Sequence, residues 1–110
     1  MDKKKLALEA AKARLDAVTM VYKAASGHPG GSLSCIDVLT YLYFEEMNVT
    51  PETYGDANRD RFVMSKGHCS PAMYSVLAER GYIPVSDLDQ FRRIDAHMSG
   101  HVEMHIKGVD

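Results

Sequence analysis

Three histidines of this chain, His28, His68 and His101, each directly follow a glycine. An imidazole can donate and accept hydrogen bonds and changes its charge near neutral pH, which suits proton transfer and the binding of polar substrates. A neighbouring glycine leaves the backbone bare, so a ligand can approach it closely. A single pair of this kind is more often a surface or packing feature. Three pairs within 110 residues favour a catalytic or binding site.

Two of these histidines lie in loops of small residues, SGHPGGSLS at residues 26–34 and SKGHCSP at residues 65–71. Each loop leads into a predicted helix. The first N–H groups of a helix have no partner within it, and the helix dipole is positive at that end. Both properties suit a phosphate group. The two loops therefore predict a site for a phosphorylated ligand.

The first element that must position these loops is a helix predicted from Lys3 to Ala25, which ends at Ser26-Gly27 with the glycine in a left-handed cap. Its apolar residues recur in alternating steps of three and four, so they share one face, which we expect to face the core. They are Leu8, Ala11, Leu15, Val18 and Tyr22. Polar residues fall elsewhere on the helix and are expected to face water. They are Lys4, Glu9, Lys12 and Asp16.

A second helix is predicted to start at Ser34, after an irregular stretch of proline and glycines. Ser34 and Asp37 have the spacing of a capping box, and Leu33 and Val38 could form the hydrophobic staple beside it. Residues 36–47 are apolar nearly all round, which indicates a helix buried on most sides. A chain of this length covers such a helix poorly, because small domains bury proportionally less surface.

The remaining segments alternate between loops and short elements. The polar residues 48–61 predict a surface loop, and the apolar residues 62–64 predict a short buried strand. Ser70-Pro71 is a typical helix start and Arg80-Gly81 a typical helix end. A further capping-box spacing, Ser86 with Asp89, predicts one more short helix.

Composition indicates one ordinary globular domain or part of one, with 45% hydrophobic and 25% charged residues. The net charge of −2 gives no general attraction to nucleic acid or to an anionic membrane. No apolar run approaches the roughly 20 residues of a membrane span. Cys35 and Cys69 form no C-x-x-C pair, which favours free thiols in a reducing, cytoplasmic compartment. Cys69 is expected to be a small packing residue rather than a reactive thiol.

Three longer stretches resemble the N-terminal part of transketolase, a thiamine-diphosphate enzyme of sugar-phosphate interconversion. They are ASGHPGGSLSCIDVLTYLYFEEMNV, RDRFVMSKGHCSPAMYSVLAERGY and LDQFRRIDAHMSGHVEMHIKGVD. The resemblance runs from about Val18 to Asp110. It implies an α/β fold, here a mostly helical fragment of the thiamine-diphosphate-binding domain with one or more short strands of a parallel sheet. Residues 1–110 are accordingly expected to be an incomplete pyrophosphate-binding domain, in the N-terminal subunit of a split transketolase.

The resemblance also implies roles for the three histidines. His28 is expected to contact the sugar substrate and to help move protons, and His101 to hydrogen-bond the donor ketose near the thiazolium. His68 is expected near the diphosphate of the cofactor. The implied reaction transfers a two-carbon ketol unit from a ketose phosphate to an aldose phosphate. The cofactor acts as electron sink, while the protein supplies positioning and proton transfer.

The sequence departs from the transketolase pattern at Val102 and Lys107, where proline is usual. The family continues beyond Gly-Val-Asp with a glycine-rich segment and a Gly-Asp-Gly stretch that holds Mg²⁺, so the magnesium ligands are expected outside this chain. The activating glutamate belongs to a later domain or to a partner chain. The expected partners are therefore sugar-phosphate substrates, further copies of the chain and a C-terminal transketolase subunit, but neither nucleic acid nor membrane. By itself the chain is expected to have no turnover.

Other readings stay open at the level of sequence. The chain could be a non-catalytic remnant or binding module of the same ancestry, or part of a related 1-deoxyxylulose-5-phosphate synthase-like enzyme. A zinc site is a further alternative, since His97, His101 and His105 are spaced four apart. Ser99-Gly100 argues against the continuous helix that would align these imidazoles, and zinc sites usually show tighter ligand pairs.

Overall fold

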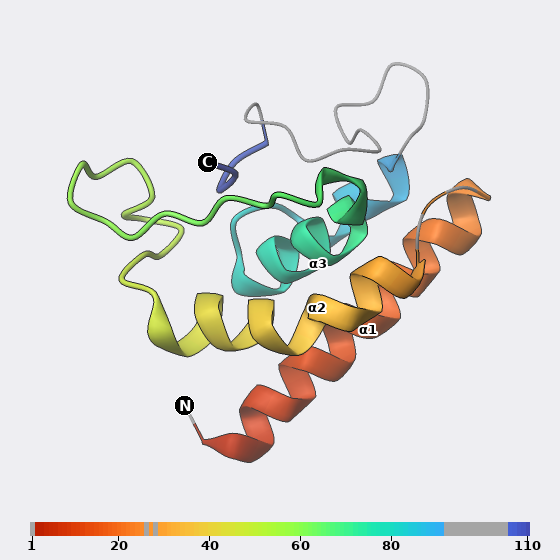
Figure 1. Ribbon diagram of the computed structural model, residues 1–110, viewed down its shortest axis with the longest axis horizontal. Coiled ribbons are helices and arrows are strands. Elements are labelled where there is room, and N and C mark those ends of the chain that lie inside the picture. Colours follow the sequence, from red (N-terminus) through yellow and green to blue (C-terminus); the bar gives the residue numbers. More distant parts are fainter. Residues whose placement is uncertain (1, 26, 28, 92–105) are drawn as a thin grey trace.

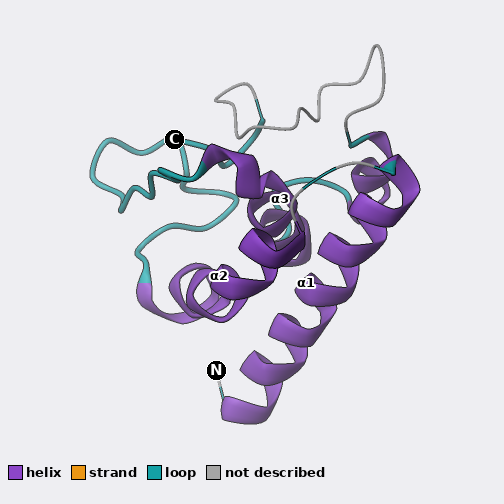
Figure 2. Ribbon diagram, turned by 45° about the vertical axis from the view of Figure 1, so that its right-hand side comes forward, coloured by secondary structure: helices purple, strands orange, loops and turns teal. Residues whose placement is uncertain are grey.

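The computed structural model describes residues 2–25, 27, 29–91 and 106–110. Within these ranges the chain forms three α-helices and three short helical turns. The α-helices are α1 (Lys3–Ala24), α2 (Pro29–Tyr41) and α3 (Ser70–Arg80). The short turns are a π-helical turn at Leu42–Glu46 and two 3-10 turns at Gly67–Cys69 and Val85–Gln90. The mostly helical character predicted from the sequence is thereby confirmed (Figure 2).

α3 is the centre of the fold, and α1 and α2 pack against it and against each other (Figure 1). Its residues from Ser70 to Ala78 are all buried. The large side chains of this core are fully enclosed, among them Met73, Tyr74 and Leu77. The helix begins and ends close to the predicted positions, with Gly81 in the left-handed region at φ 100° as its C-terminal cap. The prediction for this helix is confirmed.

α1 buries a different face from the one predicted. Its buried residues are Ala10, Ala13, Ala17 and Met20. The predicted face is instead exposed, with exposed fractions of 45% to 82% for Leu8, Leu15, Val18 and Tyr22. Three alanines in a row along one side let the α1 backbone approach its neighbours closely, and the larger side chains are left outside. The predicted orientation of α1 is therefore wrong by about half a turn, which the apolar spacing alone could not reveal.

The connection between α1 and α2 is shorter than predicted. The left-handed residue that ends α1 is Ala25 at φ 53°, although Gly27 also has a positive φ of 138°. α2 already begins at Pro29, because proline is well suited to the first turn of a helix. Ser34 consequently lies inside α2, where its hydroxyl donates to the Gly31 carbonyl at 2.8 Å. The predicted capping box and hydrophobic staple at this start are wrong.

The apolar run after Cys35 is buried on one side only. Ile36, Leu39 and Tyr43 are buried, whereas Val38 and Tyr41 are exposed by 61% and 45%. The prediction of a helix buried on most sides is therefore wrong for its outer face. Residues 48–61 form turns without a regular element, as predicted.

No strand forms among the residues that the structure describes, so the strand predicted at residues 62–64 is wrong for this chain. The segment is extended, but a strand requires a neighbouring strand with which to pair. Here the N–H of Phe62 donates to the Asp110 carboxylate at 2.7 Å instead. The last predicted helix is a 3-10 turn that begins after Pro84 with no side-chain cap, so the Ser86–Asp89 box is also wrong.

None of the described helices is both long enough and apolar enough to cross a membrane.

Candidate functional site

The two glycine–histidine loops at the starts of α2 and α3 meet in the structure. The Lys66 ammonium donates to the Gly31 carbonyl at 3.1 Å and to the Ser34 hydroxyl at 3.0 Å. Deeper in the fold, the backbone N–H of Ala72 donates to the hydroxyl of Ser32, which is fully buried, at 3.2 Å. These bonds hold the first turn of α2 in a fixed relation to the first turn of α3.

Gly31 lies at the closest point of this junction. A Cβ atom at this position would lie 2.5 Å from Cys69 Sγ and 3.6 Å from His68 Nε2. Real side chains essentially never approach so closely, so a larger residue at position 31 would force the loops to shift. Gly30, one position earlier, has nothing within 4 Å of the corresponding point. The sequence predicted that glycine leaves the backbone near the histidines open to a ligand. At Gly31 the missing side chain instead allows the two loops to pack together.

His68 is exposed on the surface of this junction, in the 3-10 turn that precedes α3. The junction also brings the N-terminal end of α3 next to the N-terminal end of α2, and adds the positive charge of Lys66. Helix N-termini and an ammonium group attract anions. The described part of the site is thus electrostatically suited to a phosphate group.

Both cysteines lie at this junction and neither forms a disulfide. Cys69 is fully buried against Gly31, which confirms its expected packing role. Cys35 is half-buried, and its thiol contacts the Gly31 and Ser32 carbonyls at 3.5 Å. Burial raises the pKa of the Cys35 thiol, although the Lys66 ammonium opposes the shift. Cys35 is therefore a protonated packing group at neutral pH.

Of the three predicted site histidines, the structure describes His68 alone, and His28 and His101 lie outside the described residues. The alternative zinc ligands His97 and His105 lie outside them as well. Among the described residues no group of three or more His, Cys, Asp or Glu side chains could hold a metal ion. Lys66 bridges the two loops, and the sequence alone did not single it out. Lys66 could have been identified from the sequence by its position two residues before His68, in a loop of small residues.

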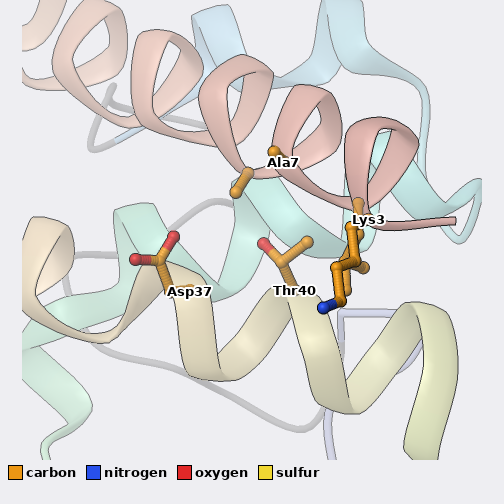
Figure 3. Close-up of a pocket in the computed structure, with 6 residues that line it drawn as sticks. Lys3, Ala7, Asp37 and Thr40 are labelled. Atoms are coloured by element: carbon orange, nitrogen blue, oxygen red, sulfur yellow. The ribbon is translucent and has the colours of Figure 1, made fainter.

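A separate pocket of about 280 Å³ lies between α1 and α2, away from the histidine loops (Figure 3). Its lining residues are Lys3, Leu6, Ala7, Ala10, Asp37 and Thr40. The Thr40 hydroxyl oxygen is buried there without a hydrogen-bond partner. His68, the predicted site residue that the structure describes, does not line this pocket.

Comparison with known proteins decides the family. Residues 5–110 match the family described as transketolase, thiamine diphosphate binding domain. The chain belongs to the transketolase N-terminal family. This confirms the resemblance that the two histidine loops suggested.

Two curated relatives are named as single subunits of a transketolase. One is a subunit of the apulose-4-phosphate transketolase of Phocaeicola vulgatus, which is 44% identical over 105 residues, covering 96% of this chain and 37% of the relative. The other is the 6-deoxy-6-sulfo-D-fructose transketolase subunit SqwG of a Clostridium species. It is 45% identical over 89 residues, covering 80% of this chain and 32% of the relative. The chain thus spans about a third of the length of these relatives.

Solved structures agree with the family assignment. The fold matches 99% of this chain to 17% of the transketolase from Campylobacter jejuni, with a TM-score of 0.85 and 35% identity. It also matches 93% of this chain to 15% of the transketolase from Leishmania mexicana, with a TM-score of 0.85 and 31% identity. The helical arrangement described above is therefore the arrangement of a transketolase N-terminal segment.

The residues at the junction fit the cofactor of this family. Thiamine diphosphate carries an anionic diphosphate, and the junction offers two helix N-termini and the Lys66 ammonium. His68 is exposed at the same place.

Proposed function

We propose that this chain is the N-terminal part of the N-terminal subunit of a split transketolase, which acts together with a C-terminal partner subunit. The reaction is the transfer of a two-carbon ketol unit from a ketose phosphate to an aldose phosphate. The names of the two subunit relatives support the division into subunits. The observation that carries the proposal is the close contact of the two histidine loops at Gly31, bridged by Lys66.

Thiamine diphosphate, when bound, supplies the electron-accepting thiazolium on which ketol transfer depends. The chain's own contribution is positioning and proton transfer. His68 holds an oxygen of the diphosphate by donating a hydrogen bond, and Lys66 keeps the loop around it in place. His28 and His101 are proposed to contact the sugar, with His28 moving a proton and His101 hydrogen-bonding the donor ketose. The magnesium ligands are proposed to lie outside residues 1–110, so this segment is an incomplete domain.

The proposal is tested with the full-length product of the gene and the product of the gene for the C-terminal subunit. The mixture should transfer a ketol unit from a ketose phosphate to an aldose phosphate in the presence of thiamine diphosphate and Mg²⁺. The 110-residue chain alone should show no turnover. Ketol transfer by this purified chain with no other subunit would falsify the proposal that the reaction needs a C-terminal partner subunit. No transfer by the reconstituted mixture with any of several donor ketoses would overturn the proposed reaction.

The role of His68 has its own readout. Replacing it in the reconstituted enzyme, His68→Ala, should weaken thiamine diphosphate binding about tenfold or more, the effect of losing one hydrogen bond to a charged group. Isothermal titration with the cofactor measures this directly. Arg61→Ala, which removes an exposed cation from the neighbouring loop, is the control and should bind as the wild type does. Unchanged affinity in His68→Ala would remove His68 from the cofactor site.

A further inference from the structure

We propose that Ser32 is a positioning residue of the cofactor site, because its hydroxyl caps the N-terminal end of α3 from the neighbouring helix α2. We call this bond between the two helices the Ser32 cap. It fixes the 3-10 turn that carries His68 and so sets how tightly the site binds a diphosphate. The inference rests on the proposed function, in which His68 contacts the cofactor. Ser32 acts through His68 and does not itself touch the cofactor.

The chain that leads into α3 does not cap this helix. The residue at the N-cap position is Cys69, and its side chain makes no capping hydrogen bond. The first backbone N–H groups of a helix need partners from outside the helix. Pro71, in the first turn, has no N–H. The N–H of Ala72, the next residue, does need an acceptor.

Ser32 supplies this acceptor from 40 positions away in the sequence. The N–H of Ala72 donates to the Ser32 hydroxyl oxygen at 3.2 Å. Both residues are 0% exposed, so water cannot take the place of the hydroxyl. A side-chain oxygen that accepts from the third N–H of a helix is the usual N-cap interaction. Here the same interaction joins two helices.

The Ser32 cap lies beside the contact at Gly31. Because Gly31 carries no side chain, α2 lies close to Cys69, and the next residue along α2 is within hydrogen-bond distance of α3. The bond from Lys66 to Ser34 joins the same two loops on the exposed side of the junction. The junction therefore has a buried hydrogen bond beneath an exposed one.

His68 is tied to the Ser32 cap through the backbone. The 3-10 turn Gly67–Cys69 runs directly into α3 at Ser70, with no residue between the two elements. The N–H of Cys69 donates to the Lys66 carbonyl at 3.0 Å, which closes the turn. A shift of the first turn of α3 therefore carries His68 with it.

Removing the Ser32 hydroxyl leaves the N–H of Ala72 buried without a partner. A buried amide without a hydrogen bond is costly, and the first turn of α3 lowers this cost by moving toward another acceptor. Such a movement displaces the His68 imidazole from a bound diphosphate. The variant Ser32→Ala should remain folded, because loss of a helix cap raises the equilibrium constant of unfolding only about fivefold.

The first test compares Ser32→Ala with Ser75→Ala in the enzyme reconstituted from the full-length subunit and its C-terminal partner. Ser75 is the matched control, because its hydroxyl is equally buried but donates to the Met20 sulfur at 3.5 Å, between α3 and α1. In Ser32→Ala, isothermal titration should show thiamine diphosphate binding weakened about three- to tenfold, up to the loss of one hydrogen bond to a charged group. Ser75→Ala should bind the cofactor as the wild type does.

Hydrogen exchange, measured by mass spectrometry, tests the Ser32 cap itself. The amide of Ala72 should exchange slowly in the wild type, because it is buried and hydrogen-bonded. Ser32→Ala should raise the exchange rate of the peptide that covers the first turn of α3 about tenfold. Ser75→Ala should leave this peptide unchanged. Equal exchange in Ser32→Ala and in the wild type would overturn the inference.

A double-mutant cycle separates positioning from a general loss of stability. If Ser32 acts through His68, Ser32→Ala should weaken cofactor binding no further in a His68→Ala background. Additive losses in the double variant would overturn the role through His68. Unchanged affinity in Ser32→Ala, with weaker binding in His68→Ala, would overturn the inference and leave the proposed function in place. Unchanged affinity in both single variants would overturn the proposed cofactor contact of His68 as well.

Discussion

At the scale of single residues, two adjacent glycines of α2 differ in how closely they are packed. Gly31 lies against Cys69 and His68, and a Cβ would lie 2.5 Å from the buried sulfur. Gly30 faces open space, and its backbone does not have a positive φ. Replacing each glycine by alanine therefore separates the effect of close packing on stability from the effect of helix propensity.

Gly31→Ala should lower the free energy of unfolding by about 1–3 kcal/mol, the usual effect of forcing an extra carbon into a packed site. Gly30→Ala should raise it by about 0.5–1 kcal/mol, because alanine loses less backbone entropy in a helix. Urea unfolding of both variants measures the difference. Equal effects of both substitutions would show that the contact at Gly31 does not constrain the loops.

At the scale of elements, α1 and α3 are joined by a pair of carboxyl groups. Asp16 of α1 was expected to face water, but it is half-buried and hydrogen-bonded to Glu79 of α3. Burial, together with that hydrogen bond and the negative charge of Glu79, raises the pKa of Asp16 to about 7, although Lys12 opposes the shift. The α1–α3 contact is therefore expected to respond to pH.

The sign of this response follows from the raised pKa. Asp16 keeps its proton in the folded state up to about pH 7 but loses it near pH 4 in the unfolded state. Its contribution to stability is therefore complete below about pH 4 and is lost as the pH rises to 7 and above. Asp16→Asn should remove this part of the pH dependence and unfold at a higher temperature than the wild type at pH 8.

Thermal unfolding at several pH values between 4 and 8 is the measurement. Asp37→Asn removes an exposed carboxylate of α2 and serves as the control for the loss of one negative charge. If the unfolding temperatures of the wild type and Asp16→Asn depend on pH in the same way, Asp16 does not hold a proton at the contact between α1 and α3.

At the scale of the whole molecule, one ion pair joins segments that are far apart in the sequence. Arg59, in the long loop, pairs with Asp110 in the last described segment, and both side chains are at most 10% exposed. Burial by itself raises the pKa of the Asp110 carboxyl, but the hydrogen bonds from Arg59 and from the N–H of Phe62 lower it more. Asp110 therefore stays charged in the fold and needs its partner.

Arg59→Gln should destabilise the protein by about 3–5 kcal/mol, because it leaves a buried carboxylate unpaired. The double variant Arg59→Gln with Asp110→Asn should recover part of this loss, since it leaves no unpaired charge. Arg61→Gln, an exposed arginine two residues away, should change stability little. Urea unfolding compares the four proteins. A loss in Arg59→Gln no larger than in Arg61→Gln would contradict a structural role for the ion pair.

The sequence by itself determined that three α-helices form and placed the ends of α1 and α3 to within a few residues, and the motifs SGHPGGSLS and SKGHCSP indicated the family. Helix spacing, the Ser-Pro start and the glycine end of α3 are local signals, and the structure confirms what they predict. A site for a phosphorylated ligand is predicted from small residues before two helix starts, and that part stays a prediction.

Only the tertiary structure decided which face of α1 is buried and which residues join the two loops. α1 carries two rows of apolar residues, and local spacing cannot tell an alanine row that packs closely from a row of larger residues that faces outward. The two loops meet where Gly31 lies against Cys69, a contact between residues 38 positions apart in the sequence. The strand expected at residues 62–64 needs a neighbouring strand, and the described chain provides none. In each case the deciding interaction is non-local, and local patterns do not contain it.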